Sequence, residues 1–304
     1  MVTREIQAKV AANKRFDGIF AVIGLVATFV GMITLAALIF DLLTDGGGRL
    51  TYTFFTAFPS RFAAQAGILS AWIGTCLIMF VTAVTAVPMG VAAGVYLEEY
   101  ARKNWVTALI EINIANLAGV PSIVYGLMAL GLFVYQLKLG QSILTAGLTL
   151  ALLILPIVIV ATREAIRAVP STMREAAYAL GATKWQTTRD HVLPYSMGGI
   201  LTGVIIALSR AIGETAPLIT IGALTFIAFL PDSPIKAEFP FISFEWLMSP
   251  FTVMPIQMFN WVSRPQQEFH LNAAATGLVL MVMTLLMNGL AIYFRYRFRK
   301  RIKW

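Results

Sequence analysis

Six long apolar stretches constrain the fold of this 304-residue chain more than any other feature of its sequence. They cover approximately residues 18–40, 71–96, 109–135, 142–162, 195–230 and 273–294. A membrane-spanning helix needs about 20 consecutive apolar residues, so each stretch is long enough to cross a bilayer. Backbone polar groups in lipid must be paired within their own segment, which a helix achieves. The sequence therefore predicts an all-α membrane protein with six transmembrane helices.

Composition agrees with a membrane location. Only 12% of the residues are charged and 58% are hydrophobic, whereas soluble domains carry about 25% charged residues. The net charge of +8 could suggest nucleic acid binding, but the basic residues lie between and beyond the apolar stretches, where membrane topology explains them better. We therefore expect no nucleic acid partner, and we expect membrane lipid around much of the surface.

The first apolar stretch is a true transmembrane helix by its length. Residues 18–40 exceed the roughly 7–15 apolar residues of a secretory signal, and no A-x-A cleavage site follows them. Most of the chain's 23 Lys and Arg residues fall in segments that would lie on one side of the membrane together with residues 1–17. The positive-inside rule then predicts that both termini are cytoplasmic, including the basic tail 295–304.

Two hydrophilic regions are then external. Residues 41–70 and 231–272 are rich in Pro, Ser and aromatic residues, and we expect them to form loops. Aromatic side chains such as Trp246 and Trp261 are expected to act as anchors at the membrane interface. The fifth apolar stretch, 195–230, is too long for one simple span, and its Gly and Pro residues predict a bend or break.

The internal connection, residues 163–194, contains helix signals of its own. Thr172 and Glu175 have the spacing of a capping box, so a helix should begin just after Pro170. Gly181 is a suitable residue to end that helix, because glycine tolerates the left-handed conformation found at helix C-termini. The sequence predicts a short helix between these two positions.

A second short helix is expected over Lys184 to Val192, stopped by Pro194. Together the two helices would form a helix-turn-helix at the cytoplasmic membrane surface, with Arg174, Lys184 and Arg189 on its exposed face. By periodicity alone, an amphipathic helix lying at the membrane interface is the simpler interpretation.

The residues of this connection nevertheless resemble a known motif. The run REAAYALG at 174–181, followed by Val-Leu-Pro at 192–194, resembles the EAA loop of bacterial ABC importer permeases. In that family the loop docks into a cleft of a separate ATPase subunit and transmits its movement to the membrane helices. The resemblance implies that ATPase coupling is carried by Arg174, Glu175, Ala176, Ala177, Gly181 and Pro194.

Two charged residues, Arg210 and Glu214, lie within the fifth apolar stretch. A charge at the bilayer centre costs about 2.5–3.5 kcal/mol on insertion scales, so such residues usually mark a transport path. Their spacing of four places both side chains, with Gly213 and Pro217, on one helical face. A planar guanidinium suits an oxyanion such as phosphate. The alternative is an ion pair that only locks helices together, although such pairs add little stability.

The segment around this pair resembles the A-type permease subunit (PstA) of bacterial phosphate ABC importers. The resemblance rests on SRAIGETAPLI at 209–219, GVPSIVYGL at 119–127, GVAAGVYLEEY at 90–100 and Ser-Pro-Phe at 249–251. It covers residues 67–294, which would form the permease domain with the fold of type I ABC importer permeases (MetI-like). Residues implied to line the substrate path are Arg210, Glu214, Thr215 and Pro217.

This chain departs from the family at the fourth span. Many A-type members carry a second arginine soon after the proline of that span, whereas here the nearest basic residue is Arg163. We therefore do not assign to Arg163 the role of that second arginine in the substrate path, and we expect it near the membrane edge. Glu98, Glu99 and Glu111 are expected at the cytoplasmic interface, where they would neutralise nearby bases, although Glu111 could line the inner mouth of the path.

Glycine pairs spaced by four residues occur in two of the predicted spans. Gly90 and Gly94 form one pair, and Gly199 and Gly203 form the other. This spacing permits close contact between helices and would suit packing against a sister permease, although it is common in any membrane helix.

The resemblance implies a transporter subunit and not an enzyme. No G-x-x-x-x-G-K-[ST] motif occurs, so we expect no cofactor in this chain and ATP bound by a partner subunit. The implied partners are a homologous permease, two ATP-binding subunits, a periplasmic or lipid-anchored phosphate-binding protein, and phosphate itself.

The sequence also leaves open a sulfate or molybdate permease and an anion channel. An intramembrane enzyme is disfavoured because no H-E-x-x-H or G-x-S-x-G motif is present, and the two histidines are too far apart for a metal site.

Overall fold

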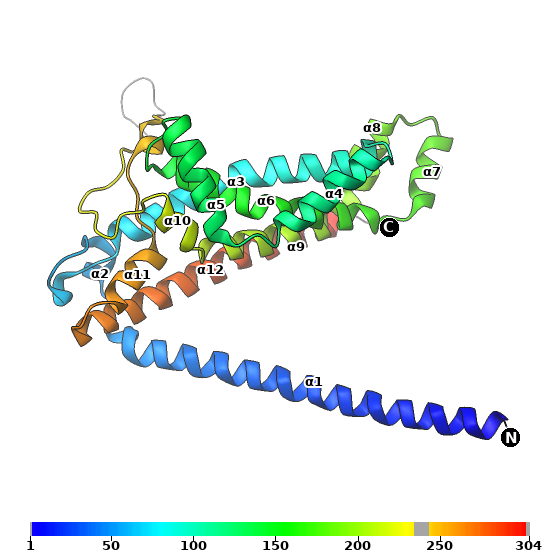
Figure 1. Cartoon of the computed structure of the whole chain (residues 1–304), viewed down its shortest axis with the longest axis horizontal. Helices are drawn as coiled ribbons and strands as arrows, with labels where there is room; N and C mark the ends of the chain where they lie inside the picture. Colours follow the sequence, from blue (N-terminus) through cyan, green and yellow to red (C-terminus); the bar gives the residue numbers. More distant parts are fainter. Residues whose placement is uncertain (1, 234–242, 302–304) are drawn as a thin grey trace.

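The computed structural model describes residues 2–233 and 243–301 and consists of helices joined by short connections (Figure 1). The helices that it contains are α1 (Val2–Gly46), α2 (Tyr52–Thr56), α3 (Leu69–Val95), α4 (Trp105–Leu117), α5 (Ser122–Ala129), α6 (Ile143–Arg167), α7 (Ser171–Ala179), α8 (Lys184–Thr187), α9 (Leu193–Ile212), α10 (Ala216–Thr220), α11 (Met254–Val262) and α12 (Gln267–Arg301). Three π-helical turns, Tyr96–Tyr100, Leu130–Gln136 and Thr188–Val192, extend α3 and α5 and join α8 to α9. The all-α prediction is confirmed.

Within the described residues, five helices are long and apolar enough to cross a membrane. A sixth crossing is made if the pair Trp105–Leu117 and Ser122–Gln136 counts as one span, although its two halves are bent by 104°. The helix expected over 109–135 is therefore not continuous but is divided into two helices. The sequence Gly119–Val120–Pro121 explains the bend, because proline disfavours a helical conformation in the residue before it and has no N–H to donate.

Helix α6 is the centre of the molecule, and α3 and α9 pack on either side of it. Glycines allow these helices to approach closely. A Cβ atom on Gly90 would come within 2.8 Å of the Val158 side chain, and one on Gly94 within 2.7 Å of Thr162. The glycines of α9 face α6 in the same way, with Gly199 against Ala165. Both glycine pairs thus serve close packing, as predicted, but they do so within this chain and not against a sister permease.

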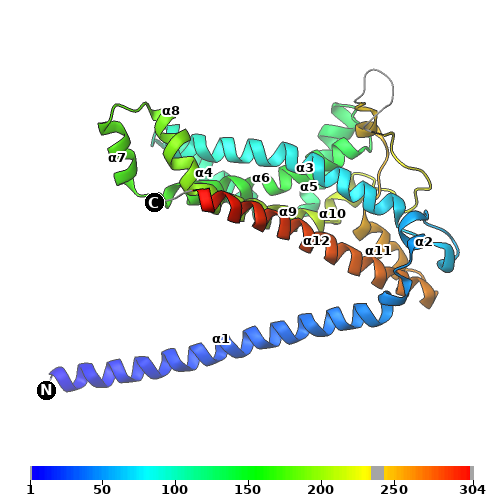
Figure 2. The same ribbon diagram turned by 180° about the vertical axis from the view of Figure 1, so that it is seen from behind.

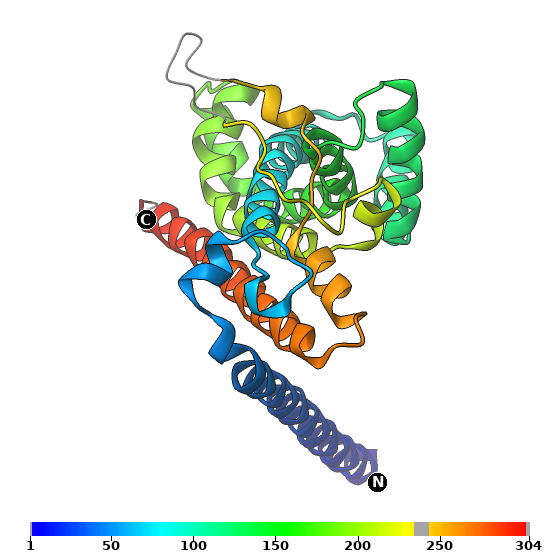
Figure 3. The same cartoon turned by 90° about the vertical axis from the view of Figure 1, so that its left-hand side faces the viewer.

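Short segments cover one end of the long helices, as seen end-on in Figure 3. This end, which we call the α2–α11 end, includes α2, α11 and the chain from 243 to 253. The predicted loops contain the short helices α2 and α11, which the sequence analysis did not anticipate, and the prediction that Trp246 and Trp261 are interface anchors is wrong. Trp261 is fully buried beside Phe54 and Phe269, and Trp246 is buried in a second cluster. Part of the predicted 231–272 loop, residues 234–242, lies outside the described residues.

Helix α1 stands apart from the rest of the chain along most of its length (Figures 1 and 2). It meets the molecule at the α2–α11 end, where Gly46 lies against the backbone of Ala274 and Ala275. Arg49, just beyond α1, donates a 2.6 Å hydrogen bond from Nε to Asn272 Oδ1 on α12 and another from Nη2 to the Ala63 carbonyl. The described apolar side chains of α1 are almost all exposed, which in a membrane means contact with lipid or another chain.

Candidate functional site

The fifth span is broken where the sequence predicts it. Helix α9 ends at Ile212, and after Gly213–Thr215 the short helix α10 begins. Arg210 and Glu214 form an ion pair across this break, with 3.3 Å between Nε and Oε1. Their side chains are 41% and 18% exposed. The expected pairing is confirmed, but the two residues do not share one continuous helical face with Pro217, because Pro217 belongs to α10 and is buried.

A second break faces the first. The Tyr125 hydroxyl of α5 donates a 2.8 Å hydrogen bond to the Leu117 carbonyl at the end of α4, which bridges the bend between these helices. Gly126 lies directly against α10, since a Cβ atom there would meet the Thr220 hydroxyl and the backbone of Pro217. The contacts of Tyr125 and Gly126 were not predicted from the sequence, in which both residues belong to the family-like segment 119–127. The proline that breaks the span was the signal that could have found them.

The two breaks place irregular backbone together inside a membrane bundle. Non-helical backbone at membrane depth is tolerated only where protein covers it or where it lines a water-filled cavity. Discontinuous helices of this kind form the substrate sites of many transporters. At the edge of this region the partly exposed Arg210 guanidinium presents N–H groups that can donate hydrogen bonds to an anion. Ser209, next to Arg210, ties the region to α12 by a 2.6 Å hydrogen bond with Asn288.

Charged residues also gather at the other end of the bundle, which we call the α7–α8 end. Arg163 is only 7% exposed and pairs with Glu111 at 2.7 Å and with Glu98 at 3.5 Å. Arg167 pairs with Glu98 and with Glu164, both at 3.1 Å. The prediction that Glu98 and Glu111 neutralise nearby bases is confirmed. These ion pairs join α3, α4 and α6.

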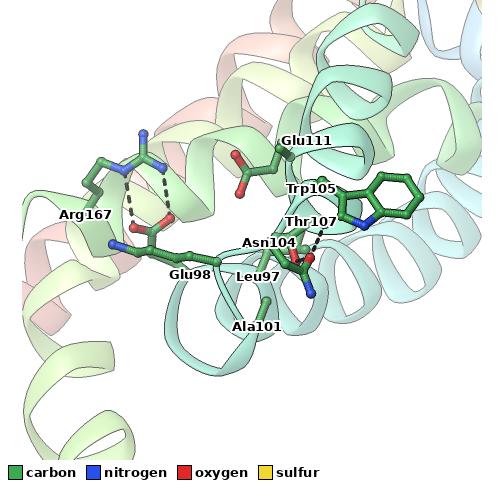
Figure 4. A pocket seen from close by; sticks show the side chains of 10 residues that line it. Leu97, Glu98, Ala101, Asn104, Trp105, Thr107, Glu111 and Arg167 are labelled. Atoms are coloured by element: carbon green, nitrogen blue, oxygen red, sulfur yellow. Dashed lines mark hydrogen bonds and ion pairs between the residues drawn. The ribbon is translucent and has the colours of Figure 1, made fainter.

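This cluster borders a cavity of about 650 Å³. Figure 4 shows the Glu98 and Glu111 carboxylates and Arg167 around it, together with Asn104 and Trp105 at the start of α4. The sequence placed Arg163 near the membrane edge but did not predict its burial or its partners. Glu98 and Glu111, from two other helical segments, pair with its guanidinium and allow it to be buried.

The connection between α6 and α9 differs in detail from its prediction. Helix α7 begins at Ser171 as expected, but its N-cap residue is Pro170 and no side chain caps it, so the predicted Thr172–Glu175 capping box is wrong. A complete capping box exists instead at Thr183 and Gln186, which begin α8. The turn at Gly181 is confirmed, and its φ of +81° is a conformation that glycine adopts at low cost.

The second helix of this connection does not stop at Pro194. It continues through the π-helical turn Thr188–Val192 directly into α9. Pro194 sits in the first turn of α9, where a missing N–H is tolerated. Thus α8, the π-helical turn and α9 form one continuous helical segment, Lys184–Ile212, which also carries Arg210. At 1.5 Å per residue, Leu193 and Arg210 lie about 26 Å apart along it.

The residues implied in ATPase coupling are divided by the structure into two groups. Glu175 and Ala176 are exposed on α7, as is Gly181 after it, whereas Ala177 is buried. Arg174 was expected on the exposed face, but it is turned inward, because Glu99 at the end of α3 accepts hydrogen bonds from its guanidinium. The coupling residues and the Arg210 region therefore do not form one site and lie at different levels of the bundle.

Comparison with known proteins identifies the architecture. Residues 86–304 match the family described as the binding-protein-dependent transport system inner membrane component. The chain belongs to this family. Its members are non-catalytic, multi-pass subunits of the inner membrane, so the chain is an ABC importer permease, and a binding-protein-dependent system implies an ATPase and a binding protein as partners.

Several curated relatives cover most of the chain. It is 32% identical to the phosphate transport system permease protein PstA of Yersinia pestis, over 93% of this chain and 91% of that protein. It is 34% identical to PstA of Haemophilus influenzae, over 75% and 80%. The probable ABC transporter permease protein YqgI of Bacillus subtilis is 32% identical over 89% and 91%.

Solved structures show the same fold. An inward-facing MetNI methionine ABC transporter chain superposes with a TM-score of 0.57 at 15% identity, over 74% of this chain and 93% of that chain. An amino acid ABC transporter chain gives a TM-score of 0.53 at 19% identity, over 76% and 93%. These likenesses confirm the predicted MetI-like permease fold.

Proposed function

We propose that this chain is one permease half of an ATP-driven importer of inorganic phosphate. It would form the translocation path together with a homologous permease, above two ATP-binding subunits, and receive phosphate from a periplasmic or lipid-anchored binding protein. The permease domain would comprise residues 67–294. The observation that carries the proposal is Arg210, a partly exposed guanidinium at a helix break within a predominantly apolar bundle.

The geometry of this pair suits a transient anion site. Among the described residues, the hydrogen bond found for the Arg210 guanidinium joins Nε to Glu214 Oε1 at 3.3 Å, so its terminal nitrogens are available to an oxyanion. A transport path must bind its ion weakly enough to release it. Glu214 supplies this property, because it neutralises Arg210 when the path is empty and repels an anion that occupies it. Thr215 and Pro217 shape the adjoining break.

The ends of the long helices support a topology with both termini in the cytoplasm. Figure 1 shows the start of α1 and the end of α12 pointing toward the side of the molecule that carries α7 and α8. In the proposed complex this is the side of the ATPase, where the exposed Glu175 and Ala176 of α7 would dock. The similarity to the phosphate transport system permease proteins of Yersinia pestis and Haemophilus influenzae supports phosphate as the cargo.

Uptake of labelled phosphate tests the proposal. The complete system would be expressed in cells that lack their own phosphate importers, with unlabelled sulfate and molybdate as competitors. We expect uptake that phosphate suppresses and the two other oxyanions do not. Uptake suppressed by sulfate or molybdate would assign the chain to a different oxyanion.

Substitution of Arg210 tests the site itself. The Arg210→Gln variant keeps a long polar side chain but loses the charge, so uptake should be abolished while the ATPase still co-purifies. Arg210→Lys keeps the charge without the planar fork and should retain only part of the uptake. The matched control is Arg61→Gln, because Arg61 is exposed near the α2–α11 end and its guanidinium lies over the Phe62 ring, away from the helix breaks. Normal uptake by Arg210→Gln would refute the proposed site.

A further inference from the structure

Arg174 of α7 makes four hydrogen bonds, all directed toward the membrane helices. Nε and Nη2 both donate to Glu99 Oε1, at 3.0 and 2.7 Å. Nη1 donates to the Val169 carbonyl at 2.9 Å, and Nη2 also donates to the Ile166 carbonyl at 3.1 Å. One guanidinium therefore connects α7 to the end of α3 through an acid and to the end of α6 through backbone.

Glu99 has Arg174 as the partner of its carboxylate among the described residues. Its side chain is only 5% exposed, and isolated buried carboxylates are strongly disfavoured. Arg174 pairs with this carboxylate, so separating the two side chains in the folded protein would have a large free-energy cost. The contact is therefore more permanent than the ion pairs at the surface of the same end.

Apart from this contact, α7 is held loosely. Ala177 is its one buried residue, and Met173 packs at the edge of a small cluster formed by Ile166, Val169 and Val192. The opposite side of the helix is exposed, including Glu175 and Tyr178. Figures 1 and 2 show α7 projecting from the end of the bundle. A force applied to α7 from outside would thus reach α3 through Arg174, in addition to reaching α6 and α8 through the chain connections on either side of α7.

The π-helical turn Tyr96–Tyr100 receives this contact, and its two adjacent acids pair with arginines of two different helices. Glu99 holds Arg174 of α7, whereas Glu98 holds Arg163 and Arg167 of α6. A displacement of Glu99 therefore moves the end of α3 and, through the preceding residue Glu98, the end of α6. Since α3 and α6 are the most extensively packed pair of helices, the displacement is shared by the centre of the bundle.

We propose that Glu99 and Arg174 form a positioning clamp, which converts movement of α7 into movement of α3 and α6 and so couples ATP hydrolysis to transport. Glu99 is thereby a positioning residue on a different span from the coupling loop. The inference rests on the proposed role of α7 as the ATPase-docking helix, and it recasts Arg174 as an internal link instead of a contact with the ATPase.

The test measures coupling and not only activity. The complete complex carrying Glu99→Gln, Arg174→Gln or both substitutions would be reconstituted in proteoliposomes with its binding protein. Substrate transported and ATP hydrolysed would be measured in the same sample, and the amount of ATPase retained on purification would be recorded. The matched control is Glu164→Gln, since Glu164 is an exposed acid at the same end that pairs with Arg167.

We expect each single variant to retain the ATPase but to transport at least tenfold less substrate per ATP hydrolysed. The double variant should be no worse than the single variants, because residues that act as one unit are not additive. Glu164→Gln should keep the normal ratio. Arg174→Lys, which keeps the charge but cannot span Glu99 and both carbonyls, should give an intermediate ratio and is less disruptive to folding.

An unchanged ratio of substrate to ATP in the single variants would overturn the clamp, and so would loss of the ATPase from Arg174→Gln, which would make Arg174 a docking contact. The result is separable from the proposed cargo. If the unmodified complex transports sulfate and not phosphate, the proposed function fails, while the ratio measured with sulfate still tests the clamp.

Discussion

The contact between α5 and α10 allows a quantitative prediction for Gly126→Ala. The added methyl group would lie 2.7 Å from the Pro217 Cα and 2.8 Å from its carbonyl oxygen, and closer still to the Thr220 hydroxyl. Ordinary van der Waals contact begins near 3.4 Å, so the two broken spans must separate by several tenths of an ångström. The Thr220 hydroxyl can rotate, but the Pro217 atoms belong to the backbone and cannot move aside by a side-chain rotation.

The expected cost is that of overpacking, about 1–3 kcal/mol. If the cost falls mainly on the state in which both breaks are in contact, the balance between transport states shifts by roughly 5- to 150-fold. Uptake should fall accordingly, while the variant still inserts and still binds the ATPase. Uptake per permease molecule in the membrane, determined with an immunoblot for normalisation, measures this.

Gly131→Ala provides the matched control on the same helical segment. A Cβ atom at Gly131 would have nothing within 4 Å, so the same chemical change there adds no contact. We expect uptake near that of the unmodified chain. Equal uptake by both variants would refute the conclusion that the tight α5–α10 contact matters for transport.

Three other predictions concern stability and topology. Trp261→Ala empties a fully buried position and should lower the stability of the chain by about 3–5 kcal/mol, seen as a lower Tm in detergent, whereas exposed Trp185→Ala should leave Tm unchanged. Glu111→Gln leaves Arg163 with its longer contact to Glu98 and should cost about 1–2 kcal/mol, because Glu111 is one-third exposed. A reporter enzyme that folds only outside the cytoplasm should be inactive when fused to the C-terminus, and activity would contradict the proposed topology.

Hydropathy and charge predicted the long helices because lipid imposes a strong and simple rule on every residue of a span. Both failures of this kind occurred where a local break or a tertiary contact overrides that rule. The 104° bend between α4 and α5 lies at Pro121, and α5 beyond it packs against α10, whereas Trp246 and Trp261 are buried because short helices fold over the α2–α11 end. Such contacts join residues far apart in the sequence and leave no periodic signal.

The polar sites show the same limit. Arg210 and Glu214 are four residues apart, so local geometry predicted their contact. The partners of Arg163 and Arg174 come from α3 and α4, more than fifty residues away, and the sequence offered several acids without indicating which one reaches which base. The capping box failed for a related reason. Pro170 already fixes the start of α7, whereas the Thr183–Gln186 pair that does form was overlooked.

The isolated position of α1 has a practical consequence. Within the described residues, a hydrogen bond between Arg49, just after α1, and Asn272 joins α1 to α12 at one end. The opposite ends of the two helices are apart, so their separation depends on what lies between them in the membrane. A pair of spin labels, one at Gly18 and one at Met287, would act as a molecular ruler for that occupant. Acyl chains would give a broad distribution of separations, whereas a neighbouring subunit would give a narrow one.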